Sequence, residues 1–266
     1  MFDSIVAQII LGGGTLYAGS YLIPWISTKY KNYLVRKLEK DNIMTIVHTS
    51  NSSISSILGI DKDNSMISIK THMDFIKTYE KLDKDKDIHL IIHTTGGALS
   101  SAEAICNCIS NHTGKGKFIC YVPYYAYSGG AMIMLSCDKV VMLKNAIIGP
   151  CDAQKPTGSL VVHSVASIID TVNYKKSKDE KISEEWLASC YDANLCKERQ
   201  REYVNKLVKE NRFPSSIAEI IYTEFFSGKY NHDKVFSAQE ALALGVNIEI
   251  VDKLPDHITN VVNDIK

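Results

Sequence analysis

The sequence predicts an α/β layered fold with a largely parallel sheet. From residue 43 onward, short strand-like segments alternate with helix-like segments, an order typical of parallel sheets covered by helices. The segment Ile88–His93 has the continuous apolar character that is expected of a strand buried on both faces. Two strand-like segments are followed by a glycine pair and then a helix-like segment, at Gly96-Gly97 and at Gly129-Gly130.

Composition limits the class of protein. The chain has 266 residues, 45% hydrophobic and 23% charged, which suits one sizeable globular domain with an appendage. Its net charge is zero, so electrostatics give no reason to expect nucleic acid as a partner. The seven cysteines form no C-x-x-C pair and lie mostly in apolar runs. We therefore expect buried, reduced thiols rather than disulfides or a zinc site.

The N-terminal segment has the character of a membrane anchor. Residues 4–28 contain no charged side chain, and about 20 apolar residues suffice to span a bilayer as a helix. Tyr21 and Trp25 fall where an interfacial aromatic belt would lie. Gln8 and the glycines at 12–14 weaken an isolated helix. A buried core helix remains an alternative, whereas the long run and the missing positive start disfavour a cleaved signal peptide.

Basic residues predict the orientation of this anchor. Only Asp3 and the N-terminal amine precede the apolar run, and four basic residues follow it at once: Lys29, Lys31, Arg36 and Lys37. By the positive-inside rule the bulk of the chain then faces the cytosol. We divide the chain into an anchor with a basic juxtamembrane helix, residues 1–40, and a folded domain, residues 41–266.

The first part of the domain follows the strand–helix order closely. Apolar β-branched runs predict strands, and apolar positions three and four apart predict helices. Strands are expected at Met44–Thr49, Ile67–Ile69, Ile88–His93, Phe118–Val122 and Lys139–Leu143, and helices at Met73–Leu82, Ser100–Ser110 and 130–137.

After Gly149-Pro150 the pattern changes. The remaining segments are an apolar helix, a charged exposed loop, a long helix, a short helix and a terminal strand. They are expected at Leu160–Val172, Asn173–Glu185, Trp186–Glu210, Ala238–Leu244 and Ile248–Val251.

A serine lies at the turn between one strand and its helix. The apolar run that ends at Val122 stops at Pro123, and Ser128 then precedes Gly129-Gly130 and a helix-length segment. Unpaired N–H groups and the positive end of the helix dipole stabilise an oxyanion at such a helix N-terminus. The alternative is a Ser-Gly-Gly turn that caps an ordinary core helix.

The second glycine pair makes the catalytic interpretation stronger. Gly96-Gly97 ends a strand one strand–helix unit before Ser128. In a right-handed parallel crossover, the two turns emerge at the same edge of the sheet. Backbone N–H groups from both turns can then converge on one carbonyl oxygen, and a nucleophile with two such donors is equipped for acyl transfer.

At these residues the chain resembles the serine dehydrogenase proteinase family. The segments are Ile91–Gly97, Tyr125–Gly130 and Ile148–Gln154. That family is similar to signal peptide peptidase A and belongs to the Clp protease/crotonase superfamily. The resemblance implies that residues 41–266 form a Clp/crotonase-like protease domain of repeated strand–strand–helix units. It further implies protein or peptide substrates, homo-oligomerisation with the 186–211 helix as a contact, and no metal or organic cofactor.

The resemblance also assigns site residues. Ser128 is implied to be the nucleophile, and the amides of Gly97 and Gly129 the oxyanion hole, supported by Gly96 and Gly130. Asp152 and Gln154 match the family and are expected to orient the active-site turn. His232 matches as well, with a structural hydrogen bond as its expected role. Thr95 departs from the family, which has Pro before the glycine pair.

The general base is open at this stage. Clp-type proteases carry a His at a position that falls near Gly149 here, and this chain lacks it; relatives like signal peptide peptidase use a Lys further along. Lys175 is our choice, with Lys176 as the alternate, because a lysine held against the apolar 160–172 segment would lose its proton near neutrality. Lys178 and Lys181 lie among charges and are expected to be solvated.

A histidine offers another base. His163, with Asp170 as its orienting carboxylate, fits the role, although a His on an apolar helix is more often a hydrogen-bonded core group.

The predicted function is a membrane-anchored serine endopeptidase with a Ser128–Lys175 dyad and an acyl-enzyme intermediate. Two alternatives share the fold. A crotonase-like acyl-CoA enzyme would use the paired N–H donors and leave the serine idle. A membrane scaffold would keep the fold without a working base.

Overall fold

The computed structural model describes residues 38–48, 66–157 and 161–265. Its centre is a five-stranded sheet in the order β1-β2-β3-β5-β10, and every neighbouring pair is parallel. This confirms the predicted α/β class and the parallel sheet. The strands are β1 Ile43–Val47, β2 Ile88–His93, β3 Phe118–Val122, β5 Lys139–Leu143 and β10 Ile248–Val251.

Helices cover both faces of this sheet. On one face, Leu90 and Ile92 pack in a core shared with α4 (Ile69–Tyr79), α5 (Leu99–Ser110) and α6 (Gly129–Ser136). On the other face, Ile91 packs against Ile258 and its neighbours on α11 (Asp256–Ile265). The alternation along β2 follows from the two-residue period of a strand, and it explains why this segment is apolar almost throughout.

A smaller sheet lies beside the main one, at the ends of its central strands. It contains β4 (Tyr125–Ala126), β6 (Ile147–Ile148) and β9 (Phe236–Ser237), in that order. The short helices η1 (Ser215–Ile217), α9 (Ala218–Ile221), η2 (Tyr222–Phe226) and α10 (Ala238–Ala243) complete this region.

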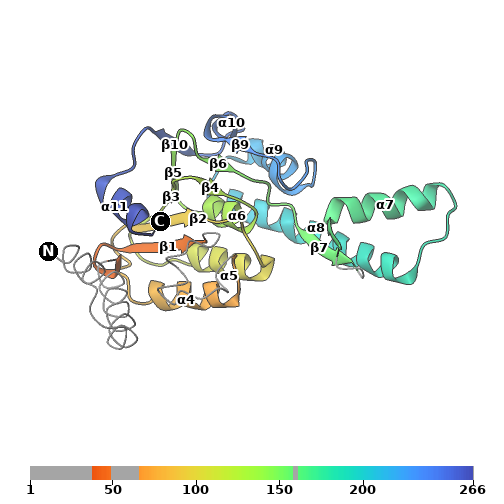
Figure 1. The fold of residues 1–266 in the computed structure, drawn as a ribbon, viewed down its shortest axis with the longest axis horizontal. Helices are drawn as coiled ribbons and strands as arrows, with labels where there is room; N and C mark the ends of the chain where they lie inside the picture. Colours follow the sequence, from red (N-terminus) through yellow and green to blue (C-terminus); the bar gives the residue numbers. More distant parts are fainter. Residues whose placement is uncertain (1–37, 49–65, 158–160, 266) are drawn as a thin grey trace, which may run out of the picture.

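A two-helix arm projects from the body of the molecule (Figure 1). The antiparallel hairpin β7 (Gln154–Thr157) and β8 (Val161–Ser164) leads into α7 (Val165–Ser177), and α8 (Glu184–Lys209) returns to the body. Ile168 and Ile169 of α7 pack against Ala193 of α8 in a small core of their own.

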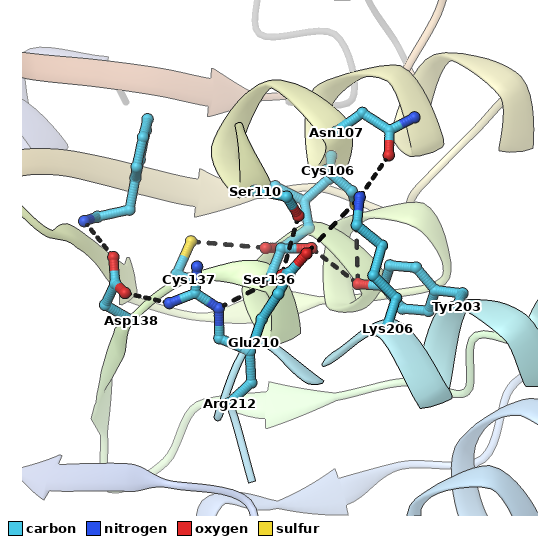
Figure 2. Close-up of polar contacts among 12 residues, drawn as sticks. Cys106, Asn107, Ser110, Ser136, Cys137, Asp138, Tyr203, Lys206, Glu210 and Arg212 are labelled. Atoms are coloured by element: carbon cyan, nitrogen blue, oxygen red, sulfur yellow. Dashed lines mark hydrogen bonds and ion pairs between the residues drawn. The ribbon is translucent and has the colours of Figure 1, made fainter. Parts of the chain in front are cut away.

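The C-terminal half of α8 fastens the arm to the body (Figure 2). The Lys206 ammonium donates to the Asn107 side chain at 2.7 Å, and the Tyr203 hydroxyl donates to the Met132 carbonyl at 2.5 Å. Arg212, just beyond α8, pairs with Asp138 at the far end of α6. The helix that begins at Ser128 is therefore held along its length by a second helix.

Several predicted elements need correction. The predicted helix 160–172 is divided, because Val161 and Val162 pair with β7 and the Ser164 side chain caps α7. The predicted 173–185 loop is shorter, because α7 continues to Ser177. The predicted strand 67–69 is only an isolated bridge from Ile67 to Gly97, since Ser68 caps α4.

The predicted anchor at residues 4–28 lies outside the described residues. Among the helices of the described segments, none combines the length and hydrophobicity needed to cross a bilayer. The division at residue 40 and the position of the domain relative to a membrane stay predictions.

Candidate active site

Ser128 occupies a strained turn at the start of α6. Its backbone has φ 50° and ψ −123°, which is unusual for a residue with a side chain. The Ser128 N–H donates a hydrogen bond to the Pro150 carbonyl at 3.0 Å. The Gly130 N–H donates to the Tyr127 carbonyl at 2.8 Å and so closes the turn around Ser128. The Ser128 side chain makes no capping bond and is half-buried, so its hydroxyl is left for other partners.

The first glycine turn packs directly against this serine. A Cβ added to Gly96 would lie 2.5 Å from Ser128 Cβ and 3.0 Å from the Gly129 nitrogen. A Cβ added to Gly129 would lie 3.8 Å from the Gly97 nitrogen. The structure thus brings together the two turns that the sequence predicts to meet.

Glycine is required in this first turn. Gly96 and Gly97 have φ values of 100° and 151°, which residues with side chains rarely adopt. At Gly97 an added Cβ would also lie 2.2 Å from the Ile67 carbonyl oxygen. The turn is pinned to the chain before α4 by the Ile67 N–H, which donates to the Gly96 carbonyl at 2.7 Å.

Two backbone donors are available beside the serine. In the parts of the chain that the structure describes, no acceptor takes the N–H of Gly97 or that of Gly129. The Gly129 N–H belongs to the first turn of α6, where the helix dipole adds positive potential. An oxygen atom that develops negative charge next to Ser128 would find both groups close at hand.

The ring of Tyr127 packs directly on the backbone of Gly149. A Cβ added to Gly149 would lie 1.9 Å from Tyr127 Cδ1, so no side chain fits at residue 149. Burial, followed by the charge of Asp233 and by Tyr125, raises the pKa of Tyr127. With its pKa raised, Tyr127 stays a neutral phenol at neutral pH.

Asp152 and His232 form a carboxylate–imidazole pair. The Asp152 carboxylate is 3% exposed, and its Oδ1 lies 2.7 Å from His232 Nδ1. Its Oδ2 accepts a hydrogen bond from Gln154 Nε2 at 2.6 Å. Asp152 follows by two residues the carbonyl of Pro150 that binds Ser128, and His232 precedes Asp233.

Sequence reasoning missed the pairing of Asp152 with His232. They are 80 positions apart in sequence and the segment between them contains the whole arm, so no local spacing signals the contact. The only available signal was that both residues match the family segments.

The predicted lysines are not brought to Ser128 within one chain. Lys175 and Lys176 lie near the end of α7 on the arm, away from α6 (Figure 1). The Lys175 side chain is 42% exposed, and its ammonium lies 3.6 Å from the Glu180 carboxylate. The apolar surroundings that our prediction requires are absent around this side chain, because α7 is solvated at its end.

The other candidates on the arm are likewise engaged there. The Lys178 ammonium lies 5.9 Å from the centre of the Tyr174 ring. His163 is on β8, where its ring centre lies 5.7 Å from that of Trp186. Within residues 38–48, 66–157 and 161–265, no group of three His, Cys, Asp or Glu side chains could hold a metal ion.

Comparisons with known proteins show the fold and the family of this chain. The chain is 28% identical over 240 residues to the uncharacterized protein MJ0137 of Methanocaldococcus jannaschii, which covers 86% of this chain and 79% of the relative. Among solved structures, ClpP1 from Listeria monocytogenes aligns with 15% identity and a TM-score of 0.50, covering 85% of this chain and 97% of its own. This likeness shows a ClpP-like fold.

A mutant of the 1510-N membrane-bound stomatin-specific protease aligns with 18% identity and a TM-score of 0.47, over 74% of this chain and 79% of its own. The family described as ClpP-like SDH-type serine proteinase matches residues 20–263. The predicted resemblance is therefore confirmed, and so is the prediction that the chain is a serine peptidase. With a match that spans nearly its whole length, this protein belongs to the ClpP-like SDH-type serine proteinases.

Proposed function

We propose that this protein is a serine endopeptidase in which Ser128 is the nucleophile and the N–H groups of Gly97 and Gly129 form the oxyanion hole. The observation that carries the proposal is the direct packing of Gly96 against Ser128 and Gly129. This packing joins a strained, half-buried serine to two unpaired backbone donors. A structural capping turn has no need of either feature.

We propose His232 as the general base, oriented by Asp152. The Asp152 carboxylate is buried and engages Nδ1 of the ring, so Nε2 is the nitrogen left to exchange a proton. Gln154 holds the second carboxylate oxygen and thereby fixes the orientation of the pair. The proposed triad residues follow one another in the sequence as Ser, Asp and His. A catalytic triad is recognised by its geometry and not by the order of its residues in the sequence.

The proposed reaction follows acyl transfer in two steps. Ser128 Oγ attacks the peptide carbonyl while His232 takes the hydroxyl proton, and the Gly97 and Gly129 amides stabilise the oxyanion. Collapse breaks the C–N bond, and the leaving amine receives the proton from His232. Water then loses a proton to His232, attacks the ester, and releases the acid product with regeneration of the Ser128 hydroxyl.

The Ser128–Lys175 dyad is the competing proposal for the base. Since Lys175 lies on the projecting arm and pairs with Glu180, this dyad would need the arm of a neighbouring copy. Lys176, which is exposed at the same place, has the same requirement. Asp152 lies two residues beyond Pro150, whose carbonyl accepts the Ser128 N–H, and it pairs with His232; this placement of the carboxylate supports the triad.

We further propose that residues 4–28 anchor the enzyme in a membrane with its protease domain on the cytosolic side, and that copies assemble. The uncharged run and the basic residues after it support the anchor. Isolation of membranes followed by carbonate extraction tests the anchor. The unaltered chain is expected to stay in the membrane pellet. Leu16→Arg is expected to move the protein toward the supernatant, because an Arg at the centre of a membrane helix costs about 3 kcal/mol of insertion free energy. Quantitative release of the unaltered chain would contradict the anchor.

Hydrolysis of casein or a fluorogenic peptide by the full chain tests the proposed reaction. Ser128→Ala and His232→Ala are expected to lower kcat/KM by at least about a thousandfold, whereas Lys175→Ala and Lys176→Ala retain it. Ser177→Ala and His163→Ala are the matched controls for the serine and the histidine. Loss of activity in Lys175→Ala with retention in His232→Ala would replace the triad by the dyad. Equal hydrolysis by Ser128→Ala and the unaltered chain would contradict Ser128 as the nucleophile. No hydrolysis by the unaltered chain would favour a scaffold, or, if labelled CoA binds, an acyl-CoA enzyme.

A further inference from the structure

Thr94, the residue after β2, contacts both catalytic turns at once. Its side chain is fully buried. The hydroxyl Oγ1 accepts a hydrogen bond from the Gly96 N–H at 3.0 Å. Its methyl Cγ2 would lie only 2.3 Å from a Cβ added to Gly130, so the methyl packs directly on the glycine backbone at the start of α6.

The Thr94 backbone bridges the same two segments. The Thr94 N–H donates to the Tyr125 carbonyl at 3.3 Å, and the Tyr127 N–H donates to the Thr94 carbonyl at 3.0 Å. These bonds set the distance between the strand ends. They do not reach the Gly96-Gly97 turn itself. The hydroxyl bond to the Gly96 N–H ties this turn to Thr94, and the Ile67 N–H on the Gly96 carbonyl ties it to the chain before α4.

A buried histidine holds the hydroxyl in turn. His48, directly after β1, is 3% exposed, and its Nδ1 lies 2.6 Å from Thr94 Oγ1. In the neutral tautomer that leaves Nδ1 unprotonated, the Thr94 hydroxyl donates to His48 Nδ1 while it accepts from the Gly96 N–H. The polar chain then runs from the Gly96 N–H through the Thr94 hydroxyl to His48.

We propose that Thr94, oriented by His48, is a positioning residue that sets the oxyanion turn against the serine turn. This inference rests on the proposed function, because it assigns to the pair the placement of the Gly97 donor relative to Ser128. Oxyanion donors act only at a defined distance from the developing charge. A shift of the turn should therefore lower the rate of the chemical step more than the binding of substrate.

The test compares two variants of Thr94 in the full-length chain. Thr94→Val keeps the shape and removes the hydroxyl, whereas Thr94→Ser keeps the hydroxyl and removes the methyl. Thr94→Val is expected to lower kcat by about 10- to 100-fold with KM within about twofold. Thr94→Ser is expected to keep most of kcat. Thr78→Val is the matched control, because the Thr78 hydroxyl bonds the Asp74 carbonyl within α4.

A second readout does not depend on activity. Hydrogen–deuterium exchange, resolved to the peptide that contains Gly96, is expected to quicken in Thr94→Val and to stay as in the unaltered chain in Thr94→Ser and Thr78→Val. If Thr94→Val fails to fold, His48→Leu and His48→Asn take its place. Loss of kcat in His48→Leu with recovery in His48→Asn, whose carbonyl offers an acceptor, supports the proposal, and equal kcat in the two overturns it.

The outcomes separate this inference from the proposed function. Unchanged Gly96 exchange, or kcat within about twofold in Thr94→Val while Ser128-dependent hydrolysis persists, overturns the positioning role. If the unaltered chain shows no Ser128-dependent hydrolysis, the proposed function fails. Faster Gly96 exchange in Thr94→Val would then still support the coupling of the two turns, and unchanged exchange would overturn it.

Discussion

The backbone of Ser128 stores strain at the reacting group. A residue with a side chain in this region of φ and ψ costs about 1–3 kcal/mol. Two hydrogen bonds hold the turn in place, one from the Ser128 N–H to Pro150 and one from the Gly130 N–H to Tyr127. The conformation turns the serine away from a capping role and toward the Gly96-Gly97 turn.

Alanine substitutions in the glycine turns should differ in effect according to the space at each position. We expect Gly97→Ala to be the most damaging, because its Cβ would meet the Ile67 backbone at 2.2 Å. Gly96→Ala follows, with Ser128 Cβ at 2.5 Å. Gly129→Ala should be mildest, since its nearest neighbour is the Ala102 methyl at 3.0 Å.

Urea denaturation measures this order. Losses of about 2 kcal/mol or more are expected at Gly97 and Gly96 and about 1 kcal/mol at Gly129. A larger loss at Gly129 than at Gly97 would show that the two turns pack differently from the structure described above.

His48 makes stability depend on pH. Burial, and secondly the neighbouring His93, lower the pKa of His48 from 6.5 to about 4. The unfolded chain takes up a proton on this residue below about pH 6.5, whereas the folded chain resists it until about pH 4. The stability that neutral His48 contributes is thus fully present above pH 6.5 and is lost as the pH falls toward 4.

When the pH falls from 7.5 to 5, the contribution of His48 to the free energy of unfolding should decrease by about 2 kcal/mol. The difference between the unaltered chain and His48→Asn in the free energy of unfolding, measured by urea at both pH values, isolates its share. Parallel pH dependence in the two proteins would rule the contribution out.

The turn that holds Ser128 could be predicted from the sequence, whereas the pairing of the proposed base with Asp152 could not. Ser128 and the glycine pairs belong to two strand–turn–helix units that follow each other, and the handedness of the crossover brings them together. Lys175 is the predicted base because it follows the apolar 160–172 segment. The sequence does not indicate that this segment enters an arm, or that His232 folds back onto Asp152.

At the scale of elements, α8 has two roles. Its N-terminal half packs on α7 in the arm, and its C-terminal half bonds α5 and α6. Ser183 caps its start, with Glu184 and Glu185 in the first turn and Lys206 and Lys209 in the last. These charges match the helix dipole, which helps a helix of 26 residues to persist beyond the body.

Tyr203→Phe tests how firmly α8 holds α6. The variant loses the hydrogen bond to the Met132 carbonyl and the contact of 2.8 Å with the Ser136 hydroxyl. We expect the free energy of unfolding to fall by about 1–2 kcal/mol. The control is Tyr174→Phe on α7, which is 62% exposed and should change stability little. Equal stability of the two variants would mean that apolar packing alone fixes α6.

Elements with strong apolar periodicity were predicted well, and those decided by pairing were not. The strands at 88–93, 118–122, 139–143 and 248–251 appear with the bounds that their apolar runs indicate. The β7–β8 hairpin has few apolar residues and depends on the pairing of Val161 and Val162 with the strand before them. A pattern read along one segment carries no information about such a partner.

At the scale of the whole molecule, the arm presents apolar side chains to solvent. Leu187, Tyr191 and Leu195 follow one another at four-residue intervals on α8 and are 41%, 67% and 44% exposed. They lie on one face of the helix. This face agrees with the prediction that the 186–211 helix contacts a second copy.

Charge on this face should weaken assembly. Tyr191→Glu combined with Leu195→Glu is expected to lower the apparent mass in sedimentation velocity, because buried carboxylates without partners oppose association. Glu202→Gln, further along α8, is the control. Identical sedimentation of all three proteins would remove α8 from the subunit contact.

The backbone strain at Ser128 also implies a trade-off between thermal stability and catalytic activity. Ser128→Gly would relax the turn without a clash, so that chain should melt at a higher temperature than Ser128→Ala while hydrolysing nothing. Variants selected for thermal stability alone would accumulate glycine at residue 128. A selection on this enzyme must therefore score product formation in the same round, or it will enrich inert proteins.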